Sequence, residues 1–246
     1  RRVTRTALPA LPVPLAFAGG GQIGSTIYVV GGQVAVKSPR FSARLFALDL
    51  AELGRPGAAW RELPALPGPA RMLPVVGAAG RGDAARLFVF SGRLPRAGQP
   101  AQLLTDGYAY DPARATWSKL GDVRIDGRGD ALCLMGATVV PDDAGLWVFG
   151  GDRGGLFAQL EAADLEVEAL RAKQKEAGAD VPALQARIDA RLRGKIAIYD
   201  THPGFSDEVL RFDATTAAWT RAGRMPVTGP VTTQAVPWGE AWIIPS

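Results

Sequence analysis

One histidine, two aspartates and four arginines are the side chains whose types and positions could carry chemistry in this chain. An imidazole or a carboxyl group whose pKa lies near the working pH can exchange protons with a substrate. A guanidinium fork can bind a carboxylate through two parallel, charge-assisted hydrogen bonds. Side chains of these types, once the fold brings them together, are suited to binding a carboxylate and exchanging protons. The predicted catalytic residues are His202, Asp130 and Asp152, and the predicted substrate-binding residues are Arg71, Arg93, Arg128 and Arg153.

A repeated pattern indicates the elements that must position these side chains. A short apolar strand ending in Gly-Gly or Ser-Gly occurs three times, about 60 residues apart, against a usual propeller-blade period of roughly 40–50 residues. Each copy is followed by a strand that ends in Asp and then by a tryptophan. The strands with their small pairs cover residues 27–32, 87–92 and 146–151, and the tryptophans are Trp60, Trp117 and Trp219.

The repeat predicts a blade of four antiparallel strands. Short strands separated by polar turns at even spacing are typical of a closed all-β array. Glycine at the end of the second strand permits a positive φ and a close approach between backbones. We expect the tryptophans to fill the wedges between adjacent blades. The predicted fold is therefore an all-β propeller that forms a single domain over residues 1–246.

The order of these features resembles the Kelch repeat, which has Gly-Gly after the second strand, an aromatic-rich third strand and Trp on the fourth. The resemblance covers essentially the whole chain and implies a Kelch-type β-propeller. It says little about function, because Kelch propellers serve both as enzymes and as binding scaffolds.

The predicted blades place the candidate side chains on one face. In an antiparallel four-stranded meander, the loops between strands two and three lie on the same face as the connections between blades. We expect this face to be one mouth of the central channel. Arg71 lies in the connection into blade two, and Arg128 and Asp130 lie in the connection into blade three. The others follow the ends of second strands or come with a later insertion: Arg93, Asp152, Arg153 and His202.

Each candidate also has a structural interpretation, and the sequence leaves both open. Arg71 and Arg128 could bridge neighbouring blades by donating hydrogen bonds to backbone carbonyls. Asp130 and Asp152 could cap turns. His202, which precedes Pro203, could stabilise its own loop.

A helical segment interrupts blade three between its second and third strands. Gly178 suits the end of a first helix, and Asp180 with Pro182 suits the start of a second. We therefore predict a helical hairpin inserted over residues 152–205, and long insertions of this kind are often lids or binding elements. Apolar residues recur at helical spacing, as Phe157, Leu160, Val167 and Leu170 and then as Leu184, Ile188 and Leu192.

The insertion narrows the resemblance to one group of Kelch propellers. Gly150-Gly151 is followed by Leu156-Phe157, a helical excursion and a return through residues 209–213 to Trp219. This order resembles the bacterial N-acetylneuraminate (sialic acid) mutarotase/epimerase group. Three further segments fall in the same order as in that group, namely residues 8–14, 67–71 and 242–244.

The resemblance implies an isomerase that interconverts sialic acid anomers without a cofactor. Sialic acid carries a carboxylate at its anomeric carbon, and mutarotation needs a base for the anomeric hydroxyl and an acid for the ring oxygen. The resemblance also implies six blades and export, hence a periplasmic or extracellular location. The alternative is a non-catalytic protein- or carbohydrate-binding module, with the hairpin's apolar stripe as a docking surface.

The blade count predicts a fragment. Three blades have four strands in the sequence, and residues 231–235 and 241–245 supply the first two strands of a fourth. Residues 3–7 have the pattern of an outer strand without a partner. We expect about three and a half blades of a six-bladed ring, incomplete at the C-terminus. A charged stretch typical of the resembled group, Gly-Glu-x-Lys-Pro-Gly-x-Arg-Thr, would begin where the sequence stops at Ser246.

Composition narrows the function classes. The chain is 47% hydrophobic and 21% charged, and it has no run of about 18 apolar residues, so we predict no membrane span. The net charge of +4 comes from scattered arginines, which does not favour nucleic-acid binding. The single Cys133 and the single His202 exclude a cysteine metal cluster and the copper-radical chemistry of galactose oxidase, so we expect no metal. The absence of a cofactor is what the resemblance implies.

Overall fold

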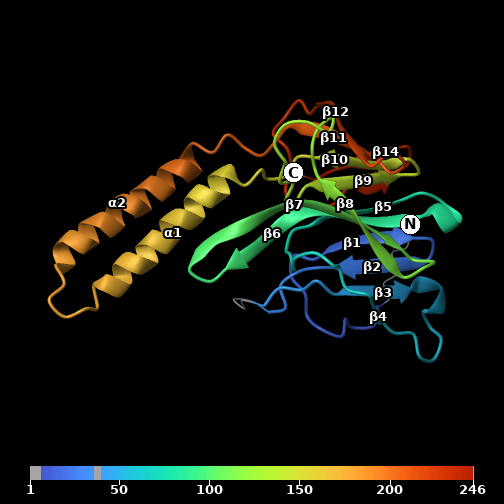
Figure 1. Ribbon diagram of the computed structural model, residues 1–246, viewed down its shortest axis with the longest axis horizontal. Coiled ribbons are helices and arrows are strands. Elements are labelled where there is room, and N and C mark those ends of the chain that lie inside the picture. The colour runs from blue at the N-terminus through green and yellow to red at the C-terminus, as the bar shows by residue number, and fades with distance from the viewer. Residues whose placement is uncertain (1–6, 36–39, 246) are drawn as a thin grey trace.

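The computed structural model of the protein describes residues 7–35 and 40–245. Its strands form three four-stranded antiparallel blades and one two-stranded sheet (Figure 1). Blade 1 comprises β1 (Gly19–Ile23), β2 (Thr26–Val30), β3 (Leu45–Asp49) and β4 (Arg61–Leu63). Blade 2 comprises β5 (Val75–Ala79), β6 (Arg86–Arg96), β7 (Gln99–Asp111) and β8 (Thr116–Asp122). Blade 3 comprises β9 (Thr138–Asp142), β10 (Gly145–Phe149), β11 (Glu208–Asp213) and β12 (Ala218–Arg224).

Each blade is a meander in sequence order, and the first strands of successive blades lie against one another. Small residues allow this close approach. A Cβ atom on Gly77 of β5 would lie 2.6 Å from Leu146 Cδ2 of blade 3. At such a distance a neighbouring side chain would have to shift, so glycine at position 77 lets β5 lie close to blade 3.

The hydrophobic core lies in two clusters between the blades. One joins blades 1 and 2 around Tyr28, Leu87 and Tyr110. The other joins blades 2 and 3 and includes Trp219, whose ring lies 4.9 Å from that of Phe90. The prediction that tryptophans fill the wedges between blades is confirmed for Trp219, which is 3% exposed.

Backbone hydrogen bonds link the residues that lead into the first strands. Leu73 N–H donates to Phe17 O at 2.9 Å, Gly136 N–H to Leu73 O at 3.0 Å, and Thr232 N–H to Gly136 O at 2.7 Å. All four residues have a positive φ, between 57° and 67°. The blades are therefore joined on one face by a continuous chain of hydrogen bonds between residues in the left-handed conformation.

The start of the fourth blade differs in part from its prediction. β13 (Val236–Trp238) pairs with β14 (Ala241–Ile243) across a turn at Gly239. β14 lies inside the predicted strand 241–245, but β13 begins after the predicted strand 231–235 has ended. Thr232, with its positive φ and its bond to Gly136, makes residues 231–235 a connection between blades rather than a regular strand. Residues 3–6 of the predicted outer strand lie outside the described residues.

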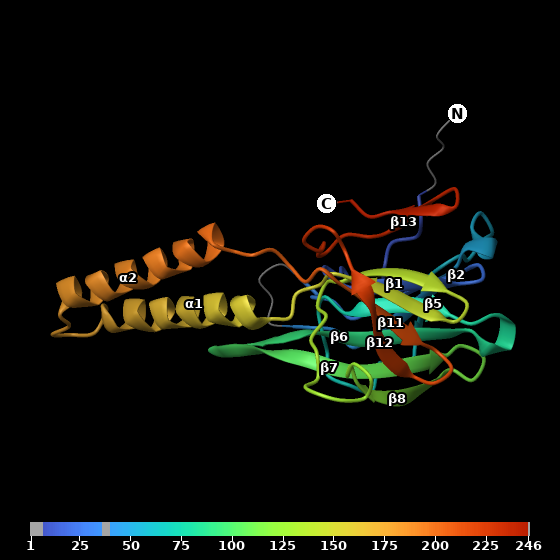
Figure 2. The same cartoon turned by 90° about the horizontal axis from the view of Figure 1, so that it is seen from above.

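The predicted helical hairpin lies between β10 and β11 and projects from the blades (Figures 1 and 2). It consists of α1 (Gly155–Lys173) and α2 (Val181–Asp200). Asp180 caps α2 by accepting a hydrogen bond from Ala183 N–H at 3.0 Å. Neither helix is long and apolar enough to cross a membrane.

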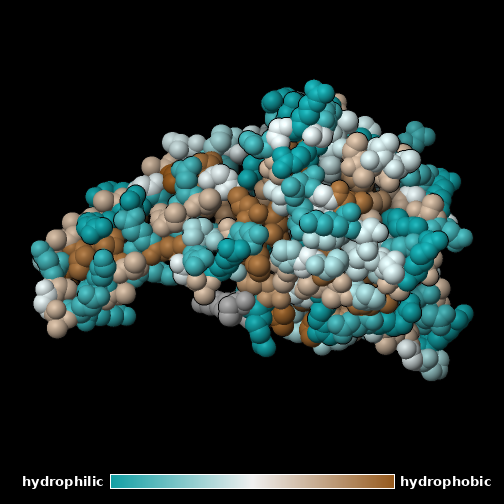
Figure 3. All heavy atoms as spheres, in the orientation of Figure 1, coloured by the Kyte–Doolittle hydropathy of each residue, from teal (hydrophilic) through white to brown (hydrophobic). Residues whose placement is uncertain are grey.

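The apolar stripes of the two helices bury each other. Val167, Leu170 and Ile188 are between 2% and 4% exposed, with Leu184 and Leu192 packed against them. Ion pairs such as Arg191–Glu166, at 2.6 Å, join α2 to α1 outside this cluster. On the face seen in Figure 3, hydrophobic residues gather where the hairpin meets the blades.

Candidate functional site

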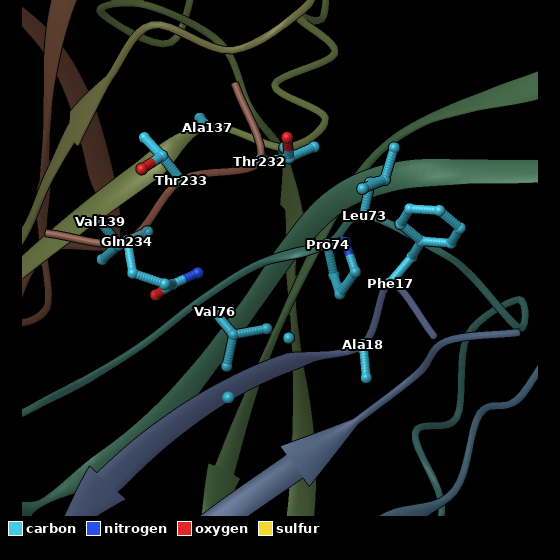
Figure 4. Close-up of a pocket in the computed structure, with 13 residues that line it drawn as sticks. Phe17, Ala18, Leu73, Pro74, Val76, Ala137, Val139, Thr232, Thr233 and Gln234 are labelled. Atoms are coloured by element: carbon cyan, nitrogen blue, oxygen red, sulfur yellow. The ribbon is translucent and has the colours of Figure 1, made fainter. Parts of the chain in front are cut away.

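The first strands of the blades surround a pocket of about 140 Å³ at the face where the blades are connected (Figure 4). Its rim includes the left-handed residues Phe17, Leu73 and Thr232. Gln234 extends from one side toward the wall formed by Val76. This pocket is the mouth of the channel that the repeat pattern predicted.

One polar side chain follows the small pair of each second strand and stands beside this mouth. These residues occupy equivalent positions, because each pairs with the residue that precedes a left-handed residue of the rim. Their backbone N–H groups donate to Ala16 O at 2.7 Å, Met72 O at 2.9 Å and Met135 O at 3.0 Å. The three residues are Gln33, Arg93 and Asp152.

Asp152 and His202 line a second pocket, of about 230 Å³, together with Arg153 and Ser206. Asp152 Oδ1 accepts a hydrogen bond from Gly154 N–H at 2.6 Å, so the turn-capping interpretation of this residue is confirmed. No hydrogen bond from any described residue reaches Asp152 Oδ2. This carboxyl oxygen is therefore available to accept a hydrogen bond in the pocket.

His202 is held in one tautomer by its own loop. Its Nδ1 accepts a hydrogen bond from Gly204 N–H at 3.0 Å, and its ring packs on Phe205 with centroids 5.1 Å apart. A neutral imidazole that accepts at Nδ1 carries its proton at Nε2. His202 thus stabilises its own loop, as the structural interpretation holds, and it also carries an N–H donor at Nε2.

Arg153 donates hydrogen bonds to three groups of the protein. Its Nη2 donates to Glu208 Oε2 at 2.8 Å and to Ser206 Oγ at 3.2 Å, and its Nη1 donates to Cys133 O at 3.3 Å. Glu208 also accepts from Arg221 Nε at 2.6 Å. Arg153 therefore lines the pocket with much of its hydrogen-bonding capacity already used.

Arg71 does not lie where a ligand could reach it. Its side chain is 0% exposed and forms a two-pronged ion pair with Asp106, at 2.8 and 3.0 Å. It also donates to Pro69 O and to Ser91 O, each at 3.1 Å. Four of its five N–H groups are therefore satisfied inside the protein. This geometry corrects the substrate-binding prediction for Arg71 in favour of the bridging interpretation.

The partner of Arg71 has a shifted pKa. Burial alone raises the pKa of the Asp106 carboxyl, but the hydrogen bonds and the charge of Arg71 outweigh burial and bring that pKa below its ordinary value. Tyr108 adds a hydrogen bond from its hydroxyl to Asp106 Oδ2 at 3.0 Å. Asp106 is thus held ionised beside Arg71 and Tyr108.

Arg93 is different. Its guanidinium carbon lies 4.0 Å from the centroid of the Phe157 ring of α1. Its Nε is buried, and within residues 7–35 and 40–245 no group accepts a hydrogen bond from it. The pKa of Arg93 is lowered because burial outweighs the charges of Glu161 and Asp152, which raise it. Arg93 lines neither pocket, but its backbone pairs with Met72 next to the rim residue Leu73. It is a half-buried cation without an ion-pair partner among the described residues.

Arg128 and Asp130 are separate from this group. Both are exposed and lie in the connection between β8 and β9. Ile125 of that connection bridges to Trp219 of β12, the outermost strand of blade 3. The connection therefore runs along the outer rim at this point, and neither residue lines the two pockets described above. The prediction that they join the others at the mouth is corrected accordingly.

Sequence reasoning missed three polar residues near the mouth: Gln33, Ser206 and Glu208. Gln33 could have been found by aligning the residue after each small pair. Glu208 has no local signal, because its partner Arg153 lies 55 residues earlier. Among the described residues, no group of three His, Cys, Asp or Glu side chains is placed to hold a metal ion.

The family model and the related proteins that match this chain agree on one family. The family model described as N-acetylneuraminate epimerase matches residues 8–244. The N-acetylneuraminate epimerase of Haemophilus influenzae (strain PittEE) is 27% identical over 224 residues, which cover 90% of this chain and 50% of that protein. The one from Pasteurella multocida (strain Pm70) is 26% identical over 226 residues, with the same coverage of 90% and 50%.

The fold has a solved counterpart. The structure of YjhT superposes with a TM-score of 0.63 at 22% identity, covering 95% of this chain and 58% of YjhT. The likeness to YjhT concerns the fold, which is a Kelch-type β-propeller. The chain spans about half the length of the curated relatives it matches.

Proposed function

We propose, from the premise that this chain belongs to the N-acetylneuraminate epimerase family, that the protein interconverts the anomers of N-acetylneuraminate or a related sugar acid at the mouth of its channel. The observation that carries this proposal is the grouping of Asp152 and His202 in one pocket, with Arg93 beside it. A proton acceptor, a hydrogen-bond donor for the ring oxygen and a cation without an ion-pair partner among the described residues together suit the anomer exchange of a sugar acid.

The reaction is an opening and closing of the sugar ring. Asp152 Oδ2 takes the proton of the anomeric hydroxyl, and the Nε2–H of His202 donates a hydrogen bond to the ring oxygen. The ring oxygen takes a proton from water as its bond to the anomeric carbon breaks. The open-chain keto acid rotates about the bond to its former anomeric carbon. On closure, the hydroxyl that re-forms the ring returns its proton to water and Asp152 gives its proton to the new anomeric hydroxyl, so no cofactor is consumed.

The substrate carboxylate is assigned to Arg93. Charge-assisted hydrogen bonds of this kind contribute about 1.5–3 kcal/mol each. Arg153, fixed by Glu208, adds positive charge to the pocket but has fewer free donors. The carboxylate is attached to the reacting carbon, so anchoring it places the anomeric hydroxyl within the same pocket as Asp152 and His202.

The docking-module alternative loses its main support. It requires an exposed apolar stripe on the helical hairpin, around Leu160, Val167 and Leu184. Val167 is 4% exposed and packs with Leu170 and Ile188, and Leu184 lies against the same cluster. The stripe is therefore occupied within the hairpin itself.

Cellular context is part of the proposal. The matched epimerases come from Haemophilus influenzae and Pasteurella multocida, which supports a role in bacterial carbohydrate metabolism. Export to the periplasm or beyond is what the resemblance to the group implies. Fractionation of cells that express the protein, with detection in the periplasmic extract, tests this location.

Proton NMR of freshly dissolved α-N-acetylneuraminate tests the activity. We expect the protein to accelerate the approach to anomeric equilibrium, and we expect Asp152→Asn and His202→Gln each to lower the acceleration about a hundredfold. Asp130→Asn is the matched control, since Asp130 lies outside the site, and should keep the wild-type rate. A folded wild-type protein without acceleration would exclude the proposed reaction.

A further inference from the structure

The helical insertion contacts Arg93 through one aromatic ring. Phe157, in the first turn of α1, lies 4.0 Å below the guanidinium carbon of Arg93. Among the arginines described near the mouth, Arg71 and Arg153 have hydrogen-bond partners for most of their donors. Arg93 is held by a ring instead.

The kind of contact matters for what Arg93 can still bind. An ion pair would use the in-plane N–H groups of the guanidinium, which are the groups that a carboxylate needs. A stacked ring uses only the flat face of the cation. Of the Arg93 nitrogens, Nε alone is buried without an acceptor among the described residues, so the two terminal nitrogens remain accessible. The geometry therefore fixes the side chain and leaves its outer donors unused.

The position of Phe157 is itself fixed by blade 2. Glu161, one turn further along α1, accepts a hydrogen bond from Ala101 N–H of β7 at 2.5 Å. Gly154 packs against Leu103 so closely that a Cβ there would lie 2.3 Å from Leu103 Cδ1. The start of α1 is thus locked to the long β6–β7 hairpin, on which Arg93 also lies.

We propose that Phe157 is a positioning residue for the sugar-acid site, holding Arg93 so that its terminal N–H groups face the substrate carboxylate. This inference rests on the proposed function of the mouth. It makes the helical insertion a part of the binding site, since the ring comes from α1. Burial lowers the pKa of Arg93, and the charges of Glu161 and Asp152 offset part of that effect without forming an ion pair with it.

The test compares a charged with an uncharged substrate. Phe157→Leu keeps bulk but removes the aromatic face, and we expect it to raise KM for N-acetylneuraminate about 3- to 30-fold, the range of a partly buried cation–π contact. The value of kcat and the KM for the methyl ester of N-acetylneuraminate should stay as in the wild type. Phe157→Trp should restore the wild-type KM. Tyr199→Leu, the same type of change at a residue of α2 that is 59% exposed, is the control.

Two results would overturn the inference. One is an unchanged KM for N-acetylneuraminate in a folded Phe157→Leu protein. The other is an equal rise of KM for the acid and for its methyl ester, which would mean that the ring supports the fold of the mouth rather than the cation.

A second measurement is independent of turnover and of the variant's stability. In ¹⁵N-labelled wild type, the Arg93 Nε–H resonance should show nuclear Overhauser contacts to the Phe157 ring, and these should persist when N-acetylneuraminate is added while the resonance shifts. Loss of the contacts on binding would overturn the inference. If the wild type shifts this resonance but does not accelerate anomer exchange, the proposed function fails while the positioning role stands.

Discussion

Arg71 and Arg93 are neighbours with opposite surroundings. The backbone of Met72 exchanges two hydrogen bonds with that of Arg93, each 2.9 Å long, so the two arginines lie on adjoining segments. Arg71 is fully buried, with Asp106 as a two-pronged partner, whereas Arg93 has a ring on one face and no ion-pair partner in the described part of the chain. Two arginines that look alike in the sequence thus differ in role, because one is consumed by the fold and one is kept open.

The largest expected effect is on stability at the closed site, which is the buried ion pair of Arg71 and Asp106. Arg71→Met removes one partner of a buried ion pair and leaves Asp106 uncompensated, so we expect the free energy of unfolding to fall by about 3–5 kcal/mol. Urea denaturation at neutral pH measures the change. Arg93→Met is the matched variant and should cost less than about 1 kcal/mol. Equal losses in the two variants would abolish the distinction between the sites.

The next effect is on ligand binding at the open site, which comprises Arg93, Asp152 and His202. Arg93→Met should weaken the binding of N-acetylneuraminate about 10- to 150-fold, the equivalent of one charge-assisted hydrogen bond. Isothermal titration calorimetry measures the dissociation constant. Arg128→Met, which removes an exposed guanidinium from the outer connection, should bind as the wild type does. Wild-type affinity in Arg93→Met would instead point to Arg153 as the carboxylate ligand.

A third effect is a pH dependence confined to the closed site. The folded-state pKa of Asp106 is lowered, so its contribution to stability is complete above the ordinary carboxyl pKa of about 3.9 and is lost as the pH falls through the lower folded-state value. Asp106→Asn should cost about 1–3 kcal/mol at neutral pH, because buried donors of Arg71 lose a charged acceptor.

The measurement is the unfolding free energy of both proteins from pH 7 downward. The difference between wild type and Asp106→Asn should shrink as the pH falls below about 4. A difference that stays constant down to the lowest pH at which both proteins fold would show that the charge of Asp106 does not stabilise the protein.

The smallest effect concerns the second hydrogen bond to Asp106. Tyr108→Phe removes the hydroxyl that lies 3.0 Å from Asp106 Oδ2, and we expect a loss of about 1 kcal/mol in unfolding free energy. Thermal unfolding followed by circular dichroism measures it. The binding of N-acetylneuraminate should not change, and a weakened affinity would show that the closed site is coupled to the open one.

Much of the fold could be predicted from the sequence because its signals are local. The small pairs that end the second strands, the Trp-bearing fourth strands and the break at residues 152–205 each mark an element within a short window. Asp180 and Pro182 placed the start of α2, where Asp180 caps the helix. The prediction of a strand at residues 231–235 was wrong because Thr232 has a positive φ, which only a glycine at that position would have indicated in the sequence.

The sequence by itself determined the repeat, the helical hairpin and the polar residues that follow the second strands, since each depends on residues close together in the chain. Only the tertiary structure decided which arginines remain available. Arg71 meets Asp106 from 35 residues away, Arg153 meets Glu208 from 55 residues away, and Arg93 meets a ring of the insertion. The chemical role of a guanidinium depends on which donors the fold has already satisfied, and long-range packing sets those partners.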